Sequence, residues 1–419
     1  MKEFDNIIGY ESIKKELYEI LAVLKEPERF QKLGAESPKG LLLYGDPGVG
    51  KTVLAEAFIK ASGRKSYPVL QQTNSDDFLR DLASLFNTAK KNAPSIIFMD
   101  DMDKYASNGN DEKPFHVLQS LIDSLRGSGV FVIATANDLM PLPRSLIREG
   151  RFDKCLQIAI PNSEDAAALV RHFLKGRPCK DVNEDDVEAM SSFRSCAAIQ
   201  AAINQSAIKA AYAGRSAITM DDVVASFLSS RASEGCSFAN DEVKKEVAIH
   251  EAGHILLNEA CLSGSVGFAT ILGGDRMEGY CRIRKDLRRR PYAILAALGG
   301  KAAVEMVLGR LASGTESDIN QAKNLILDGL GNVATGGMGF VTYRDANLRV
   351  GPRIRDETAD AATLDMERYL MKAKEMVVTN RDFLDEIASR LLKKGYLLAS
   401  EIAAIEKVHP LNVEPIRGI

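Results

Sequence analysis

A glycine-rich loop between an apolar run and a helical stretch is the feature that most restricts the fold of this chain. Leu41–Tyr44 has the length and composition of a buried strand, and Val53–Ala61 has the apolar spacing of a helix. The residues between them fit the phosphate-binding P-loop pattern, Gly45-Asp46-Pro47-Gly48-Val49-Gly50-Lys51-Thr52. The order strand, loop and helix therefore predicts an α/β nucleotide-binding domain.

The same loop predicts a nucleotide and Mg²⁺ as cofactors, and we expect the nucleotide to be ATP. Its glycines leave backbone N–H groups to surround phosphates at a helix N-terminus, while Lys51 reaches the β- and γ-phosphates. The Thr52 hydroxyl is expected to bind Mg²⁺. The nucleotide should contact the loop residues Asp46, Pro47, Gly48, Val49, Gly50, Lys51 and Thr52.

Two later strands end in polar side chains that a P-loop site needs. Ser95–Met99 is followed by Asp100, expected on Mg²⁺, and by Asp101, expected to polarise the attacking water. Phe131–Ala136 ends in Asn137, whose amide is placed to sense the γ-phosphate. Either run alone is typical of an ordinary buried strand, so the functional interpretation depends on their order after the P-loop.

The pattern of apolar runs divides the chain into four parts. Up to about residue 160, strands alternate with helical stretches, as in a doubly wound parallel sheet; the expected strands are 40–44, 67–70, 95–99, 130–134 and 156–160. The pattern is then helical only, and beyond 240 it is mostly helical with one hairpin at 268–284. We predict a nucleotide-binding subdomain (1–160), a helical small subdomain (161–230), a linker (231–240) and a mainly α-helical domain (241–410).

A second motif, of different chemistry, lies in the last of these parts. The pentapeptide His250-Glu251-Ala252-Gly253-His254 fits the H-E-x-x-H pattern of zinc hydrolases, inside a predicted helix over Val247–Leu256. Histidines four residues apart share one helix face, so both imidazoles can bind a single metal ion. Glu251 is not needed as a ligand, which suits a general base that takes a proton from water. The alternative interpretation is two surface histidines on an amphipathic helix.

Composition and charge exclude several other classes of protein. The apolar fraction of 45%, the charged fraction of 26% and the net charge of −3 are those of an ordinary globular protein, and they give no sign of nucleic-acid binding. The basic triplet Arg288-Arg289-Arg290 is interpreted as a solvated loop. No apolar stretch approaches the length of a membrane span, and the six cysteines show no C-x-x-C spacing. We therefore expect a soluble, cytoplasmic chain with reduced thiols.

The chain resembles the FtsH-type AAA+ zinc metalloproteases over nearly its whole length. Phe4–Glu11 is similar to the family's entry into its ATPase module, and Ser145–Asp153 is similar to the family's second region of homology. Gly299–Glu305 and Ser313–Ile319 resemble the family's peptidase segments. The resemblance implies an AAA+ P-loop module, with a parallel sheet and a helical small subdomain, followed by a mainly α-helical zinc peptidase domain.

The resemblance also implies roles for residues and an assembly. Ile8 and Gly9 would flank the adenine, and Arg148 and Arg151 would be arginine fingers acting on ATP in the neighbouring subunit. The family forms a homo-hexameric ring in which ATP hydrolysis pulls a polypeptide towards enclosed zinc sites. Substrate is expected to pair with an exposed strand within Arg276–Arg284, because strand addition binds peptides through backbone groups.

The third zinc ligand implied by the resemblance is Asp318. A catalytic zinc keeps three protein ligands and an open position, and the remaining downstream histidine, His409, lies near the C-terminus. A carboxylate must therefore supply the third donor, and Glu305 and Glu316 are the alternatives to Asp318. Glu305 is expected instead to support a ligand histidine without binding the metal itself.

Several departures from the family pattern concern the ATPase. The third strand ends Asp-Asp where the family has Asp-Glu, so Asp101 is one methylene shorter and hydrolysis is expected to be slower. Where the family has an aromatic pore loop, the chain reads Gln71–Phe78, and Phe78 is interpreted as a buried helix residue. The segment Leu125–Gly129 is shortened. The family's membrane-anchored region is absent, which indicates a soluble or a trimmed member; recruitment by a membrane partner stays open.

We therefore expect an ATP-dependent zinc endopeptidase that degrades unfolded or loosely folded polypeptides as a homo-hexamer. Glu251 removes a proton from water and passes it to the leaving amine, while His250, His254 and Asp318 hold the zinc. One alternative is an AAA+ remodelling ATPase whose peptidase domain is weak or only a scaffold. Another is a peptidase that uses nucleotide merely to assemble. The metal motif argues against the scaffold, whereas the altered pore loop and Asp101 favour a weak motor.

Overall fold

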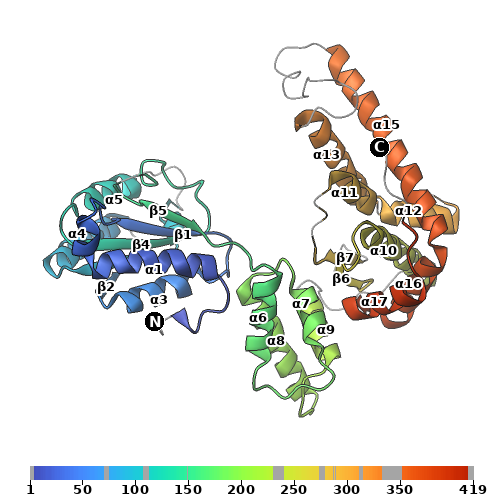
Figure 1. The fold of residues 1–419 in the computed structure, drawn as a ribbon, viewed down its shortest axis with the longest axis horizontal. Helices are drawn as coiled ribbons and strands as arrows, with labels where there is room; N and C mark the ends of the chain where they lie inside the picture. The colour runs from blue at the N-terminus through green and yellow to red at the C-terminus, as the bar shows by residue number, and fades with distance from the viewer. Residues whose placement is uncertain are drawn as a thin grey trace. The chain divides into compact units, whose positions relative to one another are not determined.

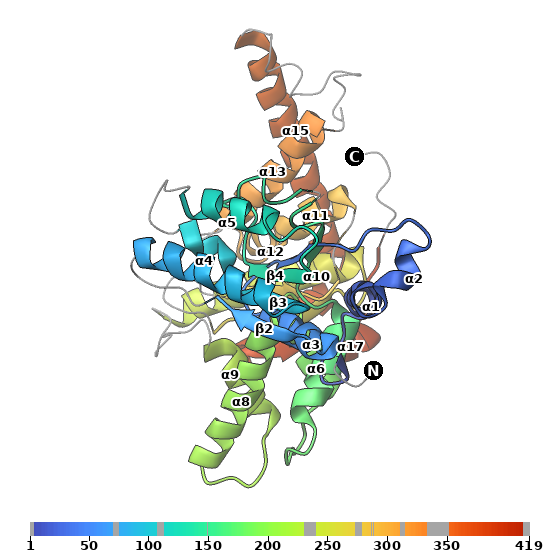
Figure 2. The same cartoon turned by 90° about the vertical axis from the view of Figure 1, so that its left-hand side faces the viewer.

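A computed structural model of the chain describes residues 4–69, 75–106, 113–148, 150–229, 240–272, 279–285, 287, 289–310, 315–332 and 352–413. The chain forms two compact units. The first unit holds residues 1–175 and 193–201, and the second holds 176–192 and 202–419. Figure 1 and Figure 2 show the elements of each unit from two directions.

The first unit is built on a five-stranded parallel sheet. In spatial order its strands are β2 (Lys65–Pro68), β3 (Ser95–Met99), β4 (Val130–Ala136), β1 (Gly40–Tyr44) and β5 (Lys154–Gln157). In the register, Leu41 of β1 pairs with Ile133 of β4 on one side and with Lys154 of β5 on the other. Because β1 lies between β4 and β5, the loop after it begins in the middle of the sheet's carboxyl edge, where parallel α/β sheets bind their ligands.

Helices cover both faces of this sheet (Figure 1). Leu41 and Leu43 lie in one core cluster with α1 (Glu11–Lys25) and α3 (Lys51–Ser62), whereas Leu42 lies in another with α4 (Ser75–Lys91) and α5 (Lys113–Asp123). The alternation follows from the two-residue period of a strand and explains why β1 is apolar throughout. The unit also contains α2 (Pro27–Gln31), the 3₁₀ helix η2 (Met102–Ala106), α6 (Ser163–Leu174) and the start of α8 (Cys196–Tyr212).

The second unit is mainly helical and is centred on α10 (Asp241–Cys261). One hydrophobic core joins α10 to α11 (Arg290–Ala297), α12 (Gly299–Leu308), α13 (Glu316–Asn332), α15 (Pro352–Thr379) and α16 (Arg381–Lys394). A Cβ atom on Gly253 of α10 would lie only 2.2 Å from the Gly299 carbonyl oxygen at the start of α12. Glycine at this crossing lets the two backbones approach and brings α12 against the metal-binding motif.

A small antiparallel sheet completes the second unit. Its order is β7 (Tyr280–Ile283), β6 (Val266–Thr270) and β8 (Tyr396–Leu398), so β7 is an edge strand of this sheet. The helices α7 (Glu184–Ser191), α9 (Met220–Ser229) and α17 (Ala399–Val408) belong to the same unit. The buried carboxylate of Asp186 on α7 accepts hydrogen bonds from the backbone N–H and hydroxyl of Ser400, at 2.9 and 2.6 Å.

The predicted fold class is confirmed: a parallel α/β sheet precedes a mainly helical region. The predicted strands 40–44 and 95–99 have the observed bounds, whereas β2 and β5 each begin two residues before their predicted starts. The predicted hairpin is present as β6 and β7, paired antiparallel. Its expected turn at Gly273-Gly274, and residues 231–239 of the expected linker, lie outside the described residues. The subdomain boundaries stay a prediction.

Within the described ranges, no single helix is long and apolar enough to cross a membrane. The helices α11 and α12 together, across a bend of 42°, have the length and apolar composition of a membrane span. Both helices contribute residues to the core around α10.

Candidate nucleotide site and metal centre

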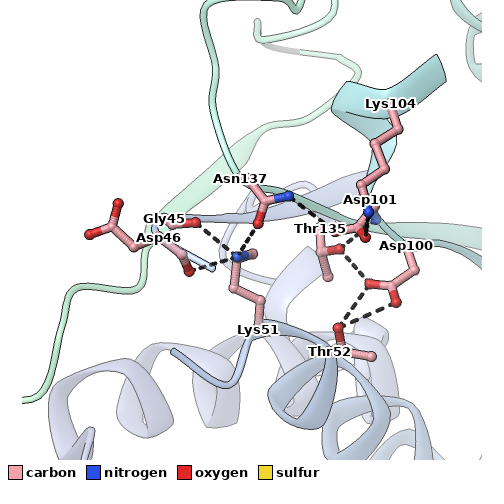
Figure 3. A network of polar contacts seen from close by, with 9 residues as sticks. All are labelled: Gly45, Asp46, Lys51, Thr52, Asp100, Asp101, Lys104, Thr135 and Asn137. Atoms are coloured by element: carbon pink, nitrogen blue, oxygen red, sulfur yellow. Dashed lines mark hydrogen bonds and ion pairs between the residues drawn. The ribbon is translucent and has the colours of Figure 1, made fainter. Parts of the chain in front are cut away.

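The P-loop connects β1 to α3 and holds its lysine through backbone oxygens (Figure 3). A Cβ on Gly45, whose φ is +144°, would lie 2.1 Å from the Ile158 carbonyl oxygen, so the turn requires glycine. Lys51 Nζ donates to the carbonyl oxygens of Gly45 and Asp46 at 2.8 and 2.9 Å, and to Asn137 Oδ1 at 2.8 Å. Burial lowers the pKa of Lys51, against the opposing effect of nearby aspartates.

Asp100 lies beside the P-loop hydroxyl, and its role as a Mg²⁺ ligand stays a prediction. Thr52 Oγ1 donates to Asp100 Oδ1 at 3.0 Å, and Thr135 Oγ1 donates to the same oxygen at 2.5 Å. The Asp101 backbone N–H in turn donates to Thr135 Oγ1 at 2.8 Å. Sequence reasoning missed Thr135; the available signal was a hydroxyl inside an otherwise apolar strand, two residues before Asn137.

Asp101 and Asn137 meet in the same network. Asn137 Nδ2 lies 3.4 Å from Asp101 Oδ1, and Lys104 Nζ lies 2.5 Å from Asp101 Oδ2 (Figure 3). A chain of polar contacts therefore runs from Lys51 through Asn137 and Asp101 to Lys104. Lys104 was not predicted, although a cation three residues after a carboxylate is a recognisable pairing signal. The roles of these residues in ATP binding and hydrolysis stay predictions.

The two residues expected beside the adenine lie in a tight turn before α1. Gly9 has a φ of +73°, and a Cβ there would lie 2.3 Å from Asp165 Oδ1, so only glycine fits. Ile8 is half-buried. The next residue, Tyr10, donates its hydroxyl to the Ala159 carbonyl oxygen at 3.0 Å. Base recognition by Ile8 and Gly9 stays a prediction.

The two predicted arginine fingers differ in their surroundings. Arg151 is 7% exposed, and its Nη2 and Nε bond the two carboxylate oxygens of Asp123 at 2.8 and 3.2 Å. This hydrogen bonding lowers the pKa of Asp123. Arg148 is exposed. Arg151 therefore has a structural contact within its own chain that the sequence did not reveal, and the action of either arginine on a neighbour's ATP stays a prediction.

The three predicted zinc ligands come together in the second unit. His250 and His254 project from α10, and Asp318 lies in the first turn of α13. The two Nε2 atoms are 3.1 Å apart and lie 3.1 and 3.2 Å from Asp318 Oδ2. Ligand atoms about 2.0–2.1 Å from a tetrahedral zinc ion lie about 3.3 Å from one another, so this donor set has the separations that zinc needs.

The imidazoles are oriented by their neighbours. His254 Nδ1 lies 2.8 Å from the Ala296 carbonyl oxygen, which only accepts, so Nδ1 carries a proton and Nε2 faces Asp318. A Cβ on Gly300 would lie 2.3 Å from His250 Cε1, so a glycine at the start of α12 leaves room for that ring. Neither Ala296 nor Gly300 was predicted to support the ligands.

Glu251 is buried beside these donors. It is 5% exposed, and burial raises its pKa to about 7. Its Oε2 has no hydrogen-bond partner among the described residues. A Cβ on Gly279, just before β7, would lie 2.8 Å from Glu251 Oε1. The carboxylate is thus in contact with the start of the edge strand, which suits a base that acts on a group brought there.

The alternatives to Asp318 are placed differently. The only group of metal-binding donors within the described part of the chain is His250, His254 and Asp318, and Glu316 is exposed. Glu305 accepts from Lys301 Nζ at 2.5 Å and Lys374 Nζ at 2.7 Å. The expectation that Glu305 supports a ligand histidine is not supported by these contacts, since both of its oxygens bond lysines.

Phe78 is buried, as expected, rather than placed to grip a substrate. Phe78 belongs to α4 and is 6% exposed in the core on one side of the sheet. Its ring centroid lies 5.3 Å from that of Tyr105 in an edge-to-face arrangement. Residues 71–74 of the expected pore loop lie outside the described residues.

Comparison with known proteins defines the class of the two sites. Residues 41–160 match the model of the ATPase family associated with various cellular activities (AAA), and residues 237–405 match that of Peptidase family M41. The chain thus joins an AAA module to an M41 peptidase domain.

Individual relatives identify the family to which the chain belongs. The ATP-dependent zinc metalloprotease FtsH 3 of Sphaerobacter thermophilus is 30% identical, over 96% of this chain and 87% of the relative. FtsH of Mycoplasma pneumoniae is 30% identical over 96% of this chain, and FtsH of Thermus thermophilus is 29% identical over 98% of it. The chain belongs to the FtsH family of ATP-dependent zinc metalloproteases, as the sequence motifs predicted. It spans 62% of the Mycoplasma pneumoniae relative's length and 71% of the Thermus relative's.

Proposed function

We propose that this chain is an ATP-dependent zinc endopeptidase that degrades unfolded or loosely folded proteins. The observation that carries the proposal is the convergence of His250, His254 and Asp318 beside the buried carboxylate of Glu251. Two imidazoles and one carboxylate are the donor set of a catalytic zinc that keeps an open position. Family membership supports the same activity, because the relatives named above are ATP-dependent zinc metalloproteases.

In the proposed mechanism, His250, His254 and Asp318 hold the metal and Glu251 moves the proton. When bound, zinc supplies Lewis-acid polarisation of the scissile carbonyl and of the attacking water. Glu251 takes a proton from that water and passes it to the leaving amine. The Ala296 carbonyl keeps the His254 ring in the tautomer that presents Nε2 to the metal.

Substrate is proposed to bind as an added strand along β7. This strand pairs with β6 on one side only in the described sheet, and its start passes Glu251. Backbone pairing at such an edge holds an extended peptide with little sequence preference, which suits unfolded protein substrates. Residues 276–278 of the predicted binding segment lie outside the described residues.

ATP and Mg²⁺ are proposed to bind at the P-loop of the first unit. Lys51 would contact the phosphates. Thr52 and Asp100, which are hydrogen-bonded to each other, would bind Mg²⁺. Asp101 is proposed to polarise the attacking water, Asn137 to sense the γ-phosphate, and Ile8 and Gly9 to flank the adenine. Arg148 and Arg151 are proposed to act on a neighbouring subunit's ATP in a homo-hexameric ring, and the protein is proposed to work in the cytoplasm.

Casein degradation tests the proposal. We expect cleavage with ATP and Mg²⁺, strongly reduced cleavage with ADP, and none after treatment with a zinc chelator. Asp318→Asn should behave like the chelated protein, whereas the matched control Glu316→Gln, an exposed carboxylate two residues away, should cleave normally. ATP hydrolysis without any cleavage in the zinc-loaded protein would favour the alternative, a remodelling ATPase with a scaffold peptidase domain.

A further inference from the structure

The carboxylate of Asp101 is held from two sides by donors of its own chain. Oδ1 lies 3.4 Å from Asn137 Nδ2, and Oδ2 lies 2.5 Å from Lys104 Nζ. Asp101 has a φ of +49°, which is uncommon for a residue other than glycine, and its N–H is bonded to Thr135 Oγ1. The hydrogen bond to Thr135 holds the backbone of Asp101, and the contact with Lys104 restrains its side chain.

Local structure places Lys104 at this carboxylate. The 3₁₀ helix η2 starts directly after Asp101, and the Lys104 backbone N–H donates to the Asp101 carbonyl oxygen at 2.9 Å. In a 3₁₀ turn, side chains three residues apart lie one above the other. Figure 3 shows the lysine reaching back from η2 to the Asp101 carboxylate, on the side away from Lys51. The ammonium is therefore held near the carboxylate by the local structure of η2.

From this geometry we propose that Lys104 is a positioning residue that slows ATP hydrolysis by holding the Asp101 carboxylate through an ion pair. The inference rests on the proposed ATPase function. A carboxylate that orients water must present a free lone pair in the right direction. The Lys104 ammonium occupies Oδ2 and holds the Asp101 carboxylate in its present orientation. Nucleotide binding depends on Lys51 and the loop backbone, so Lys104 affects turnover rather than binding.

The size of the effect is limited by the exposure of the pair. The side chains of Lys104 and Asp101 are 55% and 36% exposed, and ion pairs of this kind are weak and are screened by salt. We therefore expect a modest change in rate on removal of the Lys104 charge, about two- to fivefold, and a smaller change at high ionic strength.

The test compares steady-state ATP hydrolysis by four variants in the full chain. Lys104→Met removes the charge and keeps the length, Lys104→Arg keeps the charge, and Lys60→Met removes a charge from an exposed lysine of α3. Lys51→Ala shows that the hydrolysis measured belongs to this site. For Lys104→Met we expect a kcat raised about two- to fivefold with an unchanged KM for ATP, and parental rates for Lys104→Arg and Lys60→Met.

Two further readouts separate restraint of Asp101 from a structural role. High salt should raise the parental kcat towards that of Lys104→Met and leave the variant unchanged. In an Asp101→Asn background, Lys104→Met should give no further gain in single-turnover hydrolysis, because the ion pair is already lost. An unchanged or lowered kcat for Lys104→Met overturns the inference. If Lys51→Ala still hydrolyses ATP, the proposed ATPase site itself is wrong. If the parent is inactive and Lys104→Met hydrolyses ATP, the proposed restraint of Asp101 is supported.

Discussion

The metal centre and the nucleotide site differ in how completely one chain builds them. At the metal centre the side chains of His250, His254 and Asp318 are 16%, 13% and 18% exposed. Their donor atoms have the separations of ligands on one tetrahedral zinc ion. At the nucleotide site Asp101 is 36% exposed and is held by a lysine that is itself largely in solvent. The half-buried metal centre is fixed by packing around α10. The more exposed nucleotide site depends on weak polar contacts and, in our proposal, on arginines from a neighbour.

The largest expected effect breaks the metal centre alone. Glu251→Gln should lower peptide cleavage by about 10²- to 10⁴-fold while keeping the metal, because it removes only the proton acceptor. His254→Ala should lose both cleavage and metal. Metal analysis of the purified proteins, expected near one zinc per parental chain, and casein cleavage measure the two effects. Parental cleavage by Glu251→Gln would show that another group is the base.

A second test breaks the nucleotide site alone. Lys51→Ala should weaken nucleotide binding, because the ammonium meets the phosphates, and should reduce ATP hydrolysis by about a hundredfold or more. Asp101→Asn should bind ATP like the parent and hydrolyse it slowly, since only the charge that polarises water is lost. Fluorescent-nucleotide binding and phosphate release measure both. If Asp101→Asn turns over at the parental rate, the role proposed for Asp101 is wrong.

A third test asks how far the nucleotide site depends on a second chain. Arg148→Ala should lower ATP hydrolysis at least about tenfold with an unchanged melting temperature, because Arg148 is exposed. Arg151→Ala should lower both, with a melting temperature reduced by about 2–4 °C, because it also breaks the contact with Asp123. Mixing Arg151→Ala with Lys51→Ala chains should restore some hydrolysis if the arginine acts across a boundary.

The pH dependence of that stability difference has a defined sign. The hydrogen bond from Arg151 lowers the pKa of Asp123 in the folded chain, so the pair stabilises the fold above the unfolded carboxyl's pKa. This stabilisation is lost as the pH falls through the folded pKa. The melting temperatures of the parent and Arg151→Ala should therefore converge in acid; a difference that persists there would assign the effect to packing rather than to charge.

A further test concerns how the metal centre is supported. Gly300→Ala should weaken zinc binding by about 10- to 100-fold, because the added methyl meets the His250 ring. Gly309→Ala at the end of the same helix is the matched control, since its Cβ would enter open space, although its φ of +66° strains any other residue. Zinc affinity is measured by competition with a chelating dye. Equal affinities in both variants would mean that the ring moves without cost.

Sequence patterns predicted the parts of both sites that are local in the chain. The P-loop, the Asp100-Asp101 pair and the H-E-x-x-H helix each carry their chemistry within a few residues, so spacing was sufficient. Asp318 came from family resemblance, and its approach to α10 is a tertiary contact. Lys104 was missed although it is local to Asp101. The missed partners that are distant in the chain include Asp123, Ala296 and Thr135. Each depends on side-chain directions between distant segments, which a periodic pattern does not specify.

The three-residue strand β8 illustrates the same limit for the fold. Tyr396–Leu398 is too short to show an alternating pattern, and it pairs with Phe268–Thr270, more than a hundred residues earlier. Long, regular elements such as α10 were predicted because their own residues define them. Short elements that are stabilised by distant pairing were not.

The central claim is that two separate sites in this chain act in sequence, with ATP hydrolysis supporting cleavage at the metal centre. The most direct measurement follows casein cleavage and ATP hydrolysis together in the parent, Lys51→Ala and Glu251→Gln proteins, all loaded with zinc. The account predicts both activities in the parent, neither in Lys51→Ala, and ATP hydrolysis without cleavage in Glu251→Gln. Casein cleavage by Lys51→Ala at the parental rate would contradict it, because the peptidase would then work without the nucleotide site.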